Sequence, residues 1–400
     1  MLREKKILIG ITGSVAAYKI INLVRLLVKA GAEVKVVMTA SAKNFVSPLV
    51  LETLSKNVVL ENLSESSTWA NHVALGRWAD IFLVAPLSAN TLAKMANGIC
   101  DNLLMAVYLS ATCPVVAAPA MDEDMWLHPA TKRNVALITG YGVQLIPVEN
   151  GELASGLIGE GRMAEPETMV NFLISHYCRG TLLKDKTVLV TAGPTYEPID
   201  PVRFIGNHAS GKMGFAIAEA SYLEGANVIL ITGPTALHLS YNAIRKIAIT
   251  TANELLEQCM IEAPKADIVI MNAAVADYTP LEKTPQKIKK EKSETKWQLS
   301  LVKTTDILAL LGRQKLPHQY IMGFALETEH ELKNSLEKLN TKKIDSIVLN
   351  SLNDAQAGFG HDTNQITIIS KNGHSETITL KPKTELAKDI VLFISKELDA

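Results

Sequence analysis

The sequence predicts an α/β protein of two Rossmann-like three-layer domains, each built on a mostly parallel β-sheet. Short apolar runs alternate with helical segments from residue 6 onward, and the same pattern restarts near residue 186. The length of 400 residues also suits two domains, because domains usually comprise about 100–200 residues.

In the first half, an apolar run between a charged start and a glycine predicts a buried parallel strand. A segment with helical spacing follows this strand and stops at Gly31. Further strands alternate with helical segments, which predicts a parallel sheet covered on both faces. The expected strands are Lys6–Ile11, Glu33–Met38, Asp80–Pro86 and Pro114–Pro119, and the first expected helix is Val15–Ala30.

The second half opens in the same way, with a strand, a glycine-containing loop and a helix. We place the domain boundary near Arg179–Lys184, after a helix and before the new first strand, which gives domains 1–183 and 184–400. The expected strands are Lys186–Thr191, Asn227–Thr232 and Asp267–Asn272, and the expected helix is Lys212–Glu224.

Composition narrows the function classes. Apolar residues make up 48% and charged residues 20% of the chain, a globular balance. The formal net charge of −1 argues against nucleic acid or an anionic membrane as a partner. No apolar run reaches the length of a signal peptide or membrane span, so we expect a cytoplasmic protein. The four cysteines form no C-x-x-C pair, which argues against a zinc site and a disulfide framework; they are Cys100, Cys113, Cys178 and Cys259.

Three loops of the first half follow strand ends, where open α/β sheets bind ligands. The loop G-I-T-G-S-V-A-A-Y-K offers amides and a hydroxyl at a helix start, which suits one phosphate. It lacks the G-x-G-x-x-G pattern of dinucleotide sites. Helix capping is the alternative role for the hydroxyl and amide side chains of the third loop. The candidate ligand-binding residues are Gly13, Ser14, Thr39, Ser41, Ser88, Asn90 and Thr91.

Four motifs of the first half, in order, resemble the flavin-dependent cysteine decarboxylase family: G-S-V-A-A-Y-K, H-V-A-L-G-R-W-A-D, A-P-L-S-A-N-T-L-A-K and P-A-M-D-x-x-M-W. The resemblance implies that the residues of the three loops bind FMN between the subunits of a trimer. It also implies oxidation of a C-terminal cysteine thiol to a thioaldehyde and loss of the carboxylate. In the phosphopantothenoylcysteine branch, the same flavin then reduces the resulting enethiol.

The resemblance assigns roles to single residues. His72 matches the family's base, and an imidazole suits proton transfer near neutral pH; a structural histidine is the alternative. Arg77 and Met125 match substrate-binding positions. Asp122 stands where the family usually has asparagine, so we expect it to be protonated, turned aside or given another task. Ser155 stands where the coenzyme A branch usually has a cysteine acid, so we expect Ser155 to relay a proton or another group to supply it.

In the second half, G-N-H-A-S-G-K-M fails the phosphate-loop pattern because Met213 has no hydroxyl for magnesium. Extended backwards to G-P-T-Y-E-P-I-D-P-V-R-F-I, the same stretch resembles the phosphopantothenate–cysteine ligase family. The motifs N-A-A-V-A-D-Y, K-I-K-K and G-F-A-L-E-T continue the resemblance, which covers nearly all of Thr187–Ala400. It implies that CTP activates a carboxylate as an acyl-cytidylate, which the amine of cysteine then attacks.

The resemblance also implies which residues of the second half act. Asn207 would donate to the carbonyl oxygen as charge develops there. Lys287 would lie on a loop that closes over the intermediate and excludes water; a solvated charged loop is the alternative for residues 283–296. Core packing is the alternative for Phe324. Magnesium is expected with a nucleoside triphosphate. The implied CTP contacts are Asn272, Ala273, Asp277, Lys287, Thr305, Asp306, Ile307, Leu308, Phe324, Lys338 and Lys342.

Together the halves suggest coenzyme A biosynthesis. The second half would join 4'-phosphopantothenate to cysteine, and the first half would decarboxylate the product to 4'-phosphopantetheine. The resemblance implies a homo-oligomer, a dodecamer of trimers and dimers. Two alternatives stay open for the first half beside an active ligase: a catalytically altered FMN-binding scaffold, or a regulatory flavoprotein domain.

Overall fold

The computed structural model describes residues 2, 4–65, 68–69, 71–289, 297–327, 331–351 and 361–399. The chain divides into two compact units, Met1–Cys178 and Arg179–Ala400. Arg179 packs with the second unit, because its guanidinium donates to the backbone carbonyls of Tyr222 and Ala226 at 2.7 Å each.

The first unit contains a six-stranded sheet in the order β3-β2-β1-β6-β7-β8, and every pair is parallel. All residues of β6 are buried, as expected for a strand covered on both faces. The strands are β1 Lys6–Ile11, β2 Glu33–Met38, β3 Val59–Leu60, β6 Ile81–Leu87, β7 Val115–Pro119 and β8 Gln144–Leu145.

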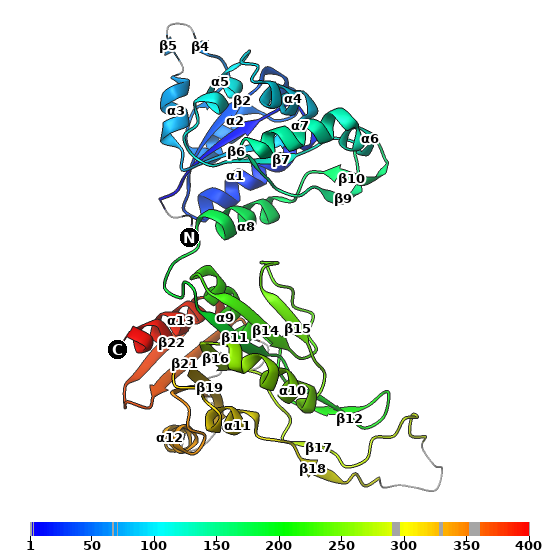
Figure 1. Ribbon diagram of the computed structural model, residues 1–400, viewed down its shortest axis with the longest axis vertical. Helices are drawn as coiled ribbons and strands as arrows, with labels where there is room; N and C mark the ends of the chain where they lie inside the picture. Colours follow the sequence, from blue (N-terminus) through cyan, green and yellow to red (C-terminus); the bar gives the residue numbers. More distant parts are fainter. Residues whose placement is uncertain are drawn as a thin grey trace. The chain divides into compact units, whose positions relative to one another are not determined.

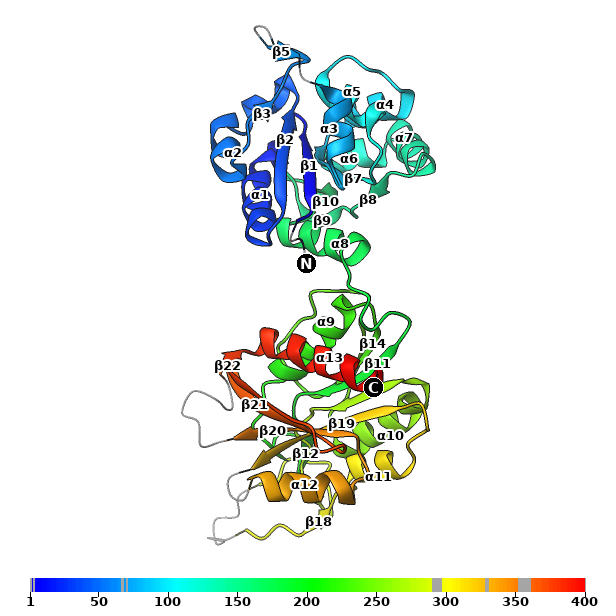
Figure 2. The same ribbon diagram turned by 90° about the vertical axis from the view of Figure 1, so that its left-hand side faces the viewer.

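Helices cover both faces of this sheet, with α1, α2 and α8 on one face and α3, α4, α5 and α7 on the other (Figures 1 and 2). In α1 the buried residues Ile20, Leu23, Val24 and Leu27 recur at helical spacing and form one apolar stripe. The helices are α1 Lys19–Lys29, α2 Pro48–Ser55, α3 His72–Trp78, α4 Ala89–Asn97, α5 Leu103–Ser110, α6 Glu123–Leu127, α7 Pro129–Gly140 and α8 Pro166–Tyr177.

Two antiparallel hairpins complete the first unit. One consists of β4 Ser64–Glu65 and β5 Thr68–Trp69. The other, which we call the flap, consists of β9 Glu149–Glu152 and β10 Ile158–Arg162 and leads into α8. The turn of the flap carries Ser155.

The second unit contains an eight-stranded sheet in the order β15-β14-β11-β16-β19-β20-β21-β22. The pairs from β15 to β20 are parallel, and β21 pairs antiparallel with both β20 and β22. The strands are β11 Thr187–Ala192, β14 Asn227–Thr232, β15 Arg245–Ala248, β16 Ile268–Met271, β19 Tyr320–Glu327, β20 Ser346–Ser351, β21 Thr363–Ser370 and β22 Ser375–Pro382.

Helices α9 and α13 pack together on one face of this sheet, and α10, α11 and α12 lie on the other (Figure 2). Two short hairpins, β12 with β13 and β17 with β18, lie beside the sheet and form an arm (Figure 1). The helices are α9 Lys212–Leu223, α10 Ala252–Glu262, α11 Ile307–Arg313, α12 Glu331–Thr341 and α13 Lys383–Asp399. The hairpin strands are β12 Tyr196–Pro198, β13 Phe204–Gly206, β17 Tyr278–Pro280 and β18 Leu301–Lys303.

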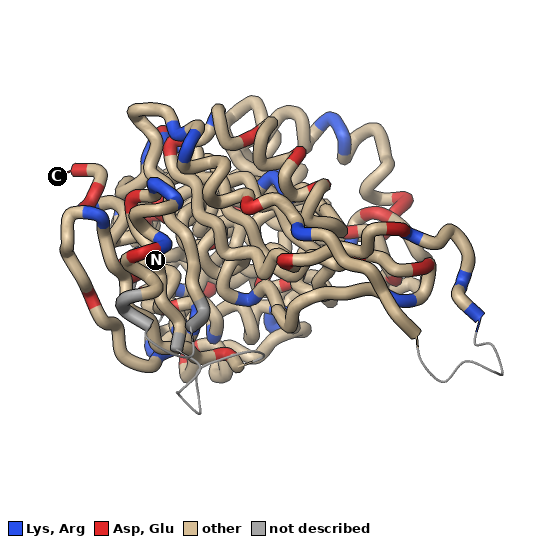
Figure 3. The backbone as a smooth tube through the Cα atoms, turned by 90° about the horizontal axis from the view of Figure 1, so that it is seen from below, with Lys and Arg blue, Asp and Glu red and all other residues tan. Residues whose placement is uncertain are grey.

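The predicted fold class, α/β with mostly parallel sheets, is confirmed. The strands expected at Lys6–Ile11, Glu33–Met38 and Asn227–Thr232 have the predicted bounds. The helix expected over Val15–Ala30 begins instead as a 3₁₀ turn, Val15–Tyr18, before α1. Figure 3 shows Lys and Arg interspersed with Asp and Glu along the backbone, as a net charge of −1 suggests. Within the described residues, no helix is long and apolar enough to cross a membrane.

Candidate active sites

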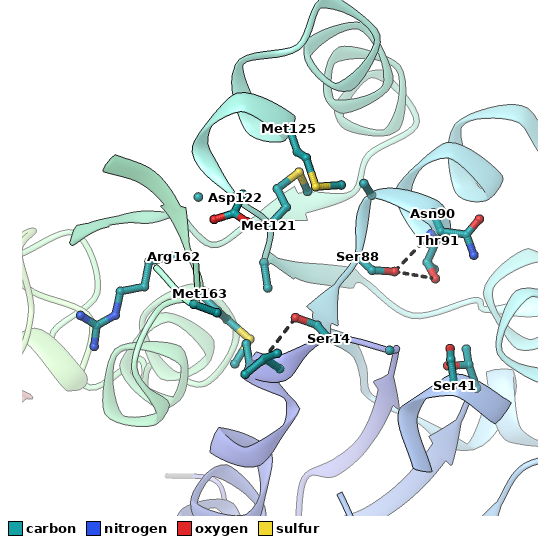
Figure 4. Close-up of a pocket in the computed structure, with 18 of the residues that line it drawn as sticks. Ser14, Ser41, Ser88, Asn90, Thr91, Met121, Asp122, Met125, Arg162 and Met163 are labelled. Carbon is teal, nitrogen blue, oxygen red and sulfur yellow. Dashed lines mark hydrogen bonds between the residues drawn. The ribbon is translucent and has the colours of Figure 1, made fainter. Parts of the chain in front are cut away.

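A pocket of about 990 Å³ lies in the first unit, where the loops after β1, β2, β6 and β7 meet the flap. Figure 4 shows the hydroxyl-bearing loops on one side of it, and α6 and the flap on the other. The structure brings together at this pocket all the residues expected to bind FMN: Gly13, Ser14, Thr39, Ser41, Ser88, Asn90 and Thr91.

Short polar contacts fix the loops of this pocket. Thr12 Oγ1 donates to the carbonyl of Pro86 at 2.6 Å and accepts from the N–H of Ser88 at 3.0 Å, which ties the first loop to the third. A Cβ on Gly13 would lie 2.6 Å from Ser41 Oγ, so only glycine allows the first and second loops to approach so closely. The three loops therefore form one rigid cradle.

Two of the hydroxyls in this cradle also cap helices. Ser14 Oγ accepts from the N–H of Ala16 at 3.3 Å, and Ser88 Oγ accepts from the N–H of Thr91 at 3.4 Å. Capping uses an oxygen lone pair, so the hydroxyl hydrogen of Ser14 remains for a bound phosphate. Ser88 donates its hydrogen to Thr91 Oγ1 at 3.4 Å, which leaves the hydroxyl hydrogen of Thr91 for the ligand. The capping role and a ligand-binding role are therefore compatible.

The flap side of the pocket contains Met121 and Asp122, which precede α6, and Met125 within α6. Gly161 has a φ of 120°, and a Cβ there would lie 2.4 Å from the carbonyl oxygen of Met121, so glycine permits this close approach. Ser155 Oγ donates to Asp122 Oδ1 at 2.6 Å. The two residues that depart from the family motifs are thus direct partners.

The sequence interpretation missed Lys19, whose side chain is 6% exposed and which lines the pocket. Its Nζ donates to the carbonyl of Met163 at 2.9 Å and to Glu165 Oε1 at 2.8 Å. Arg162 Nη2 donates to the same carboxylate at 2.6 Å. The hydrogen bond from Lys19 lowers the pKa of Glu165, which burial alone would raise, and Arg162 lowers it further. This network fastens the base of the flap to α1.

The structure does not bring His72 and Arg77 to this pocket. Both lie on α3, which contributes none of the described lining residues. Asn71 caps this helix by accepting from the N–H of Ala74 at 2.9 Å, and His72 is its half-buried first residue. Arg77 is exposed near its end.

In the second unit, the end of β11 holds the loop that follows β16. The hydroxyl of Thr191 accepts from the N–H groups of Asn272 and Ala273 at 3.1 Å each. Asn207, just after β13, donates from Nδ2 to the carbonyl of Val275 at 2.9 Å. Three motifs far apart in the sequence therefore meet at the carboxyl edge of the sheet.

The start of α11 joins the same edge. Thr304 Oγ1 donates to the carbonyl of Ala276 at 2.6 Å, and the N–H of Thr304 donates to the carbonyl of Asp277 at 2.9 Å. Asp306 caps α11 by accepting from the N–H of Ala309 at 3.0 Å. Thr305 and Asp277 are exposed here, as contacts for a nucleotide must be.

Lys342 reaches this helix start from the end of α12. Its Nζ lies 3.1 Å from Asp306 Oδ2, at the start of α11. Its backbone carbonyl oxygen packs against Gly312, near the end of α11, where an added Cβ would lie only 1.8 Å away. The Lys342 side chain therefore extends along α11. Lys342 is one residue beyond α12, but its N–H still donates to the carbonyl of Lys338 at 3.0 Å, so the two lysines remain one helical turn apart.

The remaining predicted nucleotide contacts differ in how deeply their side chains are buried. Ile307 is 3% exposed and belongs to the core, so only its backbone is open to a nucleotide. Phe324 is half-buried and is not part of the core cluster that contains Ile307. The Leu308 side chain packs directly against Gly323. A Cβ added at Gly323 would lie 2.7 Å from Leu308 Cδ2.

Lys287 is exposed, and the next residue is held in place. The N–H of Ile288 donates to Asp200 Oδ2 at 3.1 Å. Burial tends to raise the pKa of Asp200, but backbone N–H donors and Arg203 outweigh this effect and bring the pKa to about 2. The sequence interpretation quoted the motif that contains Asp200 but gave this residue no role. Lys290, the last residue of K-I-K-K, lies outside the described residues.

Metal ligands are not evident in the part of the chain that the structure describes. Within it, no group of three or more His, Cys, Asp or Glu side chains is placed to hold a metal ion.

The family profiles that match the chain divide it near the boundary between the two structural units. The profile of the family described as "Flavoprotein" matches residues 1–177. The profile described as "DNA/pantothenate metabolism flavoprotein C-terminal domain" matches residues 183–398.

Two curated relatives and one solved structure are similar to this chain. A cysteine/cysteine sulfinic acid decarboxylase from an unknown prokaryotic organism is 48% identical over 86% of this chain and 98% of that protein. The coenzyme A biosynthesis bifunctional protein CoaBC of Bacillus subtilis (strain 168) is 41% identical over 98% of this chain and 97% of that protein. The crystal structure of the C-terminal domain of a CoaBC protein is 36% identical, with a TM-score of 0.47, and covers 55% of this chain and 99% of that chain.

Proposed function

We infer the function of each unit from one premise: this chain belongs to the family of bifunctional coenzyme A biosynthesis proteins. The observation that carries this premise is the match to a bifunctional relative over 98% of the chain. The resemblance that the motifs indicated is confirmed for both halves. The protein is an enzyme of coenzyme A biosynthesis, with a flavoprotein decarboxylase unit followed by a ligase unit.

The finer assignment is our proposal. The second unit would use CTP to activate 4'-phosphopantothenate as an acyl-cytidylate and would join it to cysteine. The first unit would then decarboxylate 4'-phosphopantothenoylcysteine to 4'-phosphopantetheine. The order is chemically consistent, because the ligase product ends in the cysteine that the decarboxylase consumes.

FMN fits the pocket of the first unit. A volume of about 990 Å³ is at the upper end of ligand pockets. Ser14, Ser88 and Thr91 supply hydroxyls for a phosphate, and Met121, Met125 and Met163 supply apolar surface for a ring. The flavin, when bound, accepts two electrons from the substrate thiol and later returns them.

The protein's own groups would carry out the remaining steps. His72 would remove the thiol proton, and Arg77 would bind substrate. Because α3 lies away from the pocket lining, we propose that His72 acts on the pocket of a neighbouring copy in a trimer. Asp122 and Ser155 would close over the substrate and supply the proton for reduction of the enethiol.

In the second unit, Asn207 would donate to the carboxylate that becomes the acyl-cytidylate, and Lys287 would act when cysteine attacks. Lys338 and Lys342 would bind phosphate charge, with Asp277 and the start of α11 around the nucleoside. Magnesium would enter with the triphosphate, which supplies most of its oxygen ligands. The oligomer that we propose is a dodecamer, with trimeric contacts in the first unit and dimeric contacts in the second.

A second candidate concerns the substrate of the first unit. The relative at 48% identity is named for decarboxylation of cysteine and cysteine sulfinic acid. The first unit would then decarboxylate one of these small amino acids and not the ligated product.

One experiment separates the candidates. The full chain is incubated with 4'-phosphopantothenate, cysteine and CTP, and each species is identified by mass spectrometry. We expect the acyl-cytidylate, then phosphopantothenoylcysteine, then phosphopantetheine. Parallel reactions contain cysteine or cysteine sulfinic acid alone. Carbon dioxide from these, without decarboxylation of the ligated product, would establish the second candidate.

A further inference from the structure

The turn between β12 and β13 contains a fully buried carboxylate. The Asp200 side chain has 0% exposure, and all its described contacts are with donors. Oδ1 accepts from the N–H groups of Val202 and Arg203 at 2.8 Å each. Oδ2 accepts from the N–H of Ile288 at 3.1 Å and from the Arg203 guanidinium. One oxygen therefore shapes the turn, while the other reaches a loop 88 positions away in the sequence.

This loop is held at two points on either side of Lys287. The Arg203 guanidinium also donates to the carbonyl of Ile288 at 3.3 Å, so both backbone polar groups of Ile288 bind the turn. Earlier in the loop, the N–H of Thr284 donates to the carbonyl of Ile199 at 3.0 Å. Lys287 lies between these ties and is exposed. The backbone on both sides of Lys287 is therefore tied to the hairpin, while the Lys287 side chain is exposed.

The hairpin that holds the loop of Lys287 also leads to Asn207. Strand β13 runs from the Asp200 turn directly to Asn207, which is itself held by its bond to Val275. The loop of Lys287 is therefore bound to the same hairpin that leads into Asn207, the residue expected to bind the substrate carboxylate. A loop released from the hairpin would lose this relation.

We propose that Asp200 is a positioning residue of the ligase, which holds the segment of Lys287 against the hairpin that carries Asn207. The inference rests on the proposed role of Lys287. Asp200 does not touch the substrate; it acts through the N–H of Ile288. Its loss should slow the attack of cysteine, the step in which Lys287 acts, more than the release of pyrophosphate.

The most selective variant is Asp200→Asn. The amide oxygen can still accept from Val202 and Arg203 and so preserve the turn. The amide nitrogen then faces the N–H of Ile288 and the Arg203 guanidinium. All three groups are donors, so these hydrogen bonds cannot form. A second variant, Ile288→Pro, removes the same N–H from the other side without altering the hairpin. The matched control is Asp185→Asn, the same change at an exposed position.

Two measurements on the full-length chain test the proposal. One is the rate of trypsin cleavage after Lys287 and Lys289, which reports release of the loop. The other compares the rate of pyrophosphate release with the rate of cysteine consumption in single turnovers. We expect Asp200→Asn to speed cleavage and slow cysteine consumption by about tenfold each, since a hydrogen bond to a charged group is lost. Pyrophosphate release should change little. Ile288→Pro should slow cysteine consumption and speed cleavage after Lys289 to the same extent, although it blocks cleavage after Lys287 because trypsin does not cut a Lys–Pro bond; the double variant should add nothing.

Wild-type cleavage and wild-type cysteine consumption in Asp200→Asn would overturn the proposal. Equal loss of both half-reactions with a lowered unfolding temperature in both variants would also overturn it, because Asp200 would then only stabilise the fold. Lys287→Gln is measured alongside. If it has normal turnover, the proposed role of Lys287 fails, whereas normal turnover in Asp200→Asn alone removes only the positioning role.

Discussion

Ser155 donates its hydroxyl hydrogen to Asp122 Oδ1 across 2.6 Å. This distance lies within the usual range for an O–H···O hydrogen bond. Ser155 lies in the turn of the flap and Asp122 at the start of α6, so the bond links the flap to the floor of the pocket. Ser155 and Asp122, the two residues that differ from the family motifs, are thus bound to each other. We therefore expect the effects of substituting them to be coupled.

We predict that Ser155→Cys alone is tolerated and that Asp122→Asn alone impairs reduction of the enethiol, so that oxidised product accumulates. A serine is a weak acid, so Ser155 can pass a proton to the substrate only if a protonated Asp122 replaces that proton. The double substitution should recover activity, since it restores the commoner pair. Mass analysis of reduced and unreduced product in the four variants measures this.

The coupling should amount to about 0.5–3 kcal/mol, the range for residues in direct contact. Additive effects of the two substitutions would show that the hydrogen bond has no catalytic consequence. The compensation hypothesis would then be abandoned.

The sequence predicted those parts of the site that follow from local pattern. Buried strands are continuous apolar runs, so their ends, and the loops with Ser14, Ser88 and Asn272, could be located. The contacts between distant segments could not. Lys19 binds Glu165 across 146 positions, and Asp200 binds Ile288 across 88. A charged residue in a motif indicates neither its burial nor its partner, because both depend on how strands and hairpins are arranged in space.

A second prediction concerns the FMN cradle. Gly13→Ala would place a Cβ 2.8 Å from the Cβ of Ser41 and 3.3 Å from its carbonyl carbon, so the two loops must separate. We expect FMN to bind about tenfold more weakly, consistent with an overpacking cost of about 1–3 kcal/mol. Flavin absorbance after dialysis of the purified protein measures this.

Gly140→Ala is the matched control, because a Cβ there meets no atom within 4 Å. It should retain a yellow colour equal to that of the wild type. A colourless wild-type protein that cannot be reconstituted with FMN would contradict the flavin assignment itself.

A third prediction separates the two activities. His72→Asn should stop release of carbon dioxide and leave ligation intact, because the proposed base belongs to the first unit only. Carbon dioxide and phosphopantothenoylcysteine are measured in the same reaction. Decarboxylation at a near wild-type rate would mean that His72 is structural.

The same variant tests whether His72 acts across a subunit interface. Mixed oligomers of His72→Asn and Gly13→Ala chains should regain part of the decarboxylase activity, since some pockets combine an intact cradle with an intact histidine. Without any gain on mixing, His72 would have to serve the pocket of its own chain.

A fourth prediction concerns stability of the second unit. Asp345 is buried and binds Lys315 and Lys371 at 2.5 Å each. Burial tends to raise its pKa, but the two lysines and the N–H of Ile321 outweigh this and lower it. Asp345→Asn should reduce the free energy of unfolding by about 3 kcal/mol, because two ammonium groups lose their partner. Urea unfolding at neutral pH measures this.

The sign of the pH effect follows from the lowered pKa. The contribution of Asp345 is fully present above its ordinary value of 3.8 and is lost as the pH falls through the lower folded-state value. The difference in stability between wild type and Asp345→Asn should therefore shrink below about pH 4. Asp185→Asn, the same change at an exposed position, is the matched control.

The last prediction contrasts the two proposed ligase residues. Asn207 donates to the carbonyl of Val275 at 2.9 Å. In Asn207→Asp, a carboxylate oxygen would face this carbonyl oxygen, and the donor for the developing charge would be lost. We expect no acyl-cytidylate and no pyrophosphate release. Lys287→Gln leaves Asn207 untouched, so the acyl-cytidylate should form and accumulate, because only its use by cysteine is slowed.

Quenched reactions with CTP and 4'-phosphopantothenate, analysed before and after addition of cysteine, distinguish the two variants. The loss in each affected step should be at least about a hundredfold, the usual cost of removing one donor to a developing oxyanion. Equal pyrophosphate release by both variants would remove the distinction between the two roles. Accumulation of the acyl-cytidylate in Asn207→Asp would instead assign Asn207 to the second step, together with Lys287.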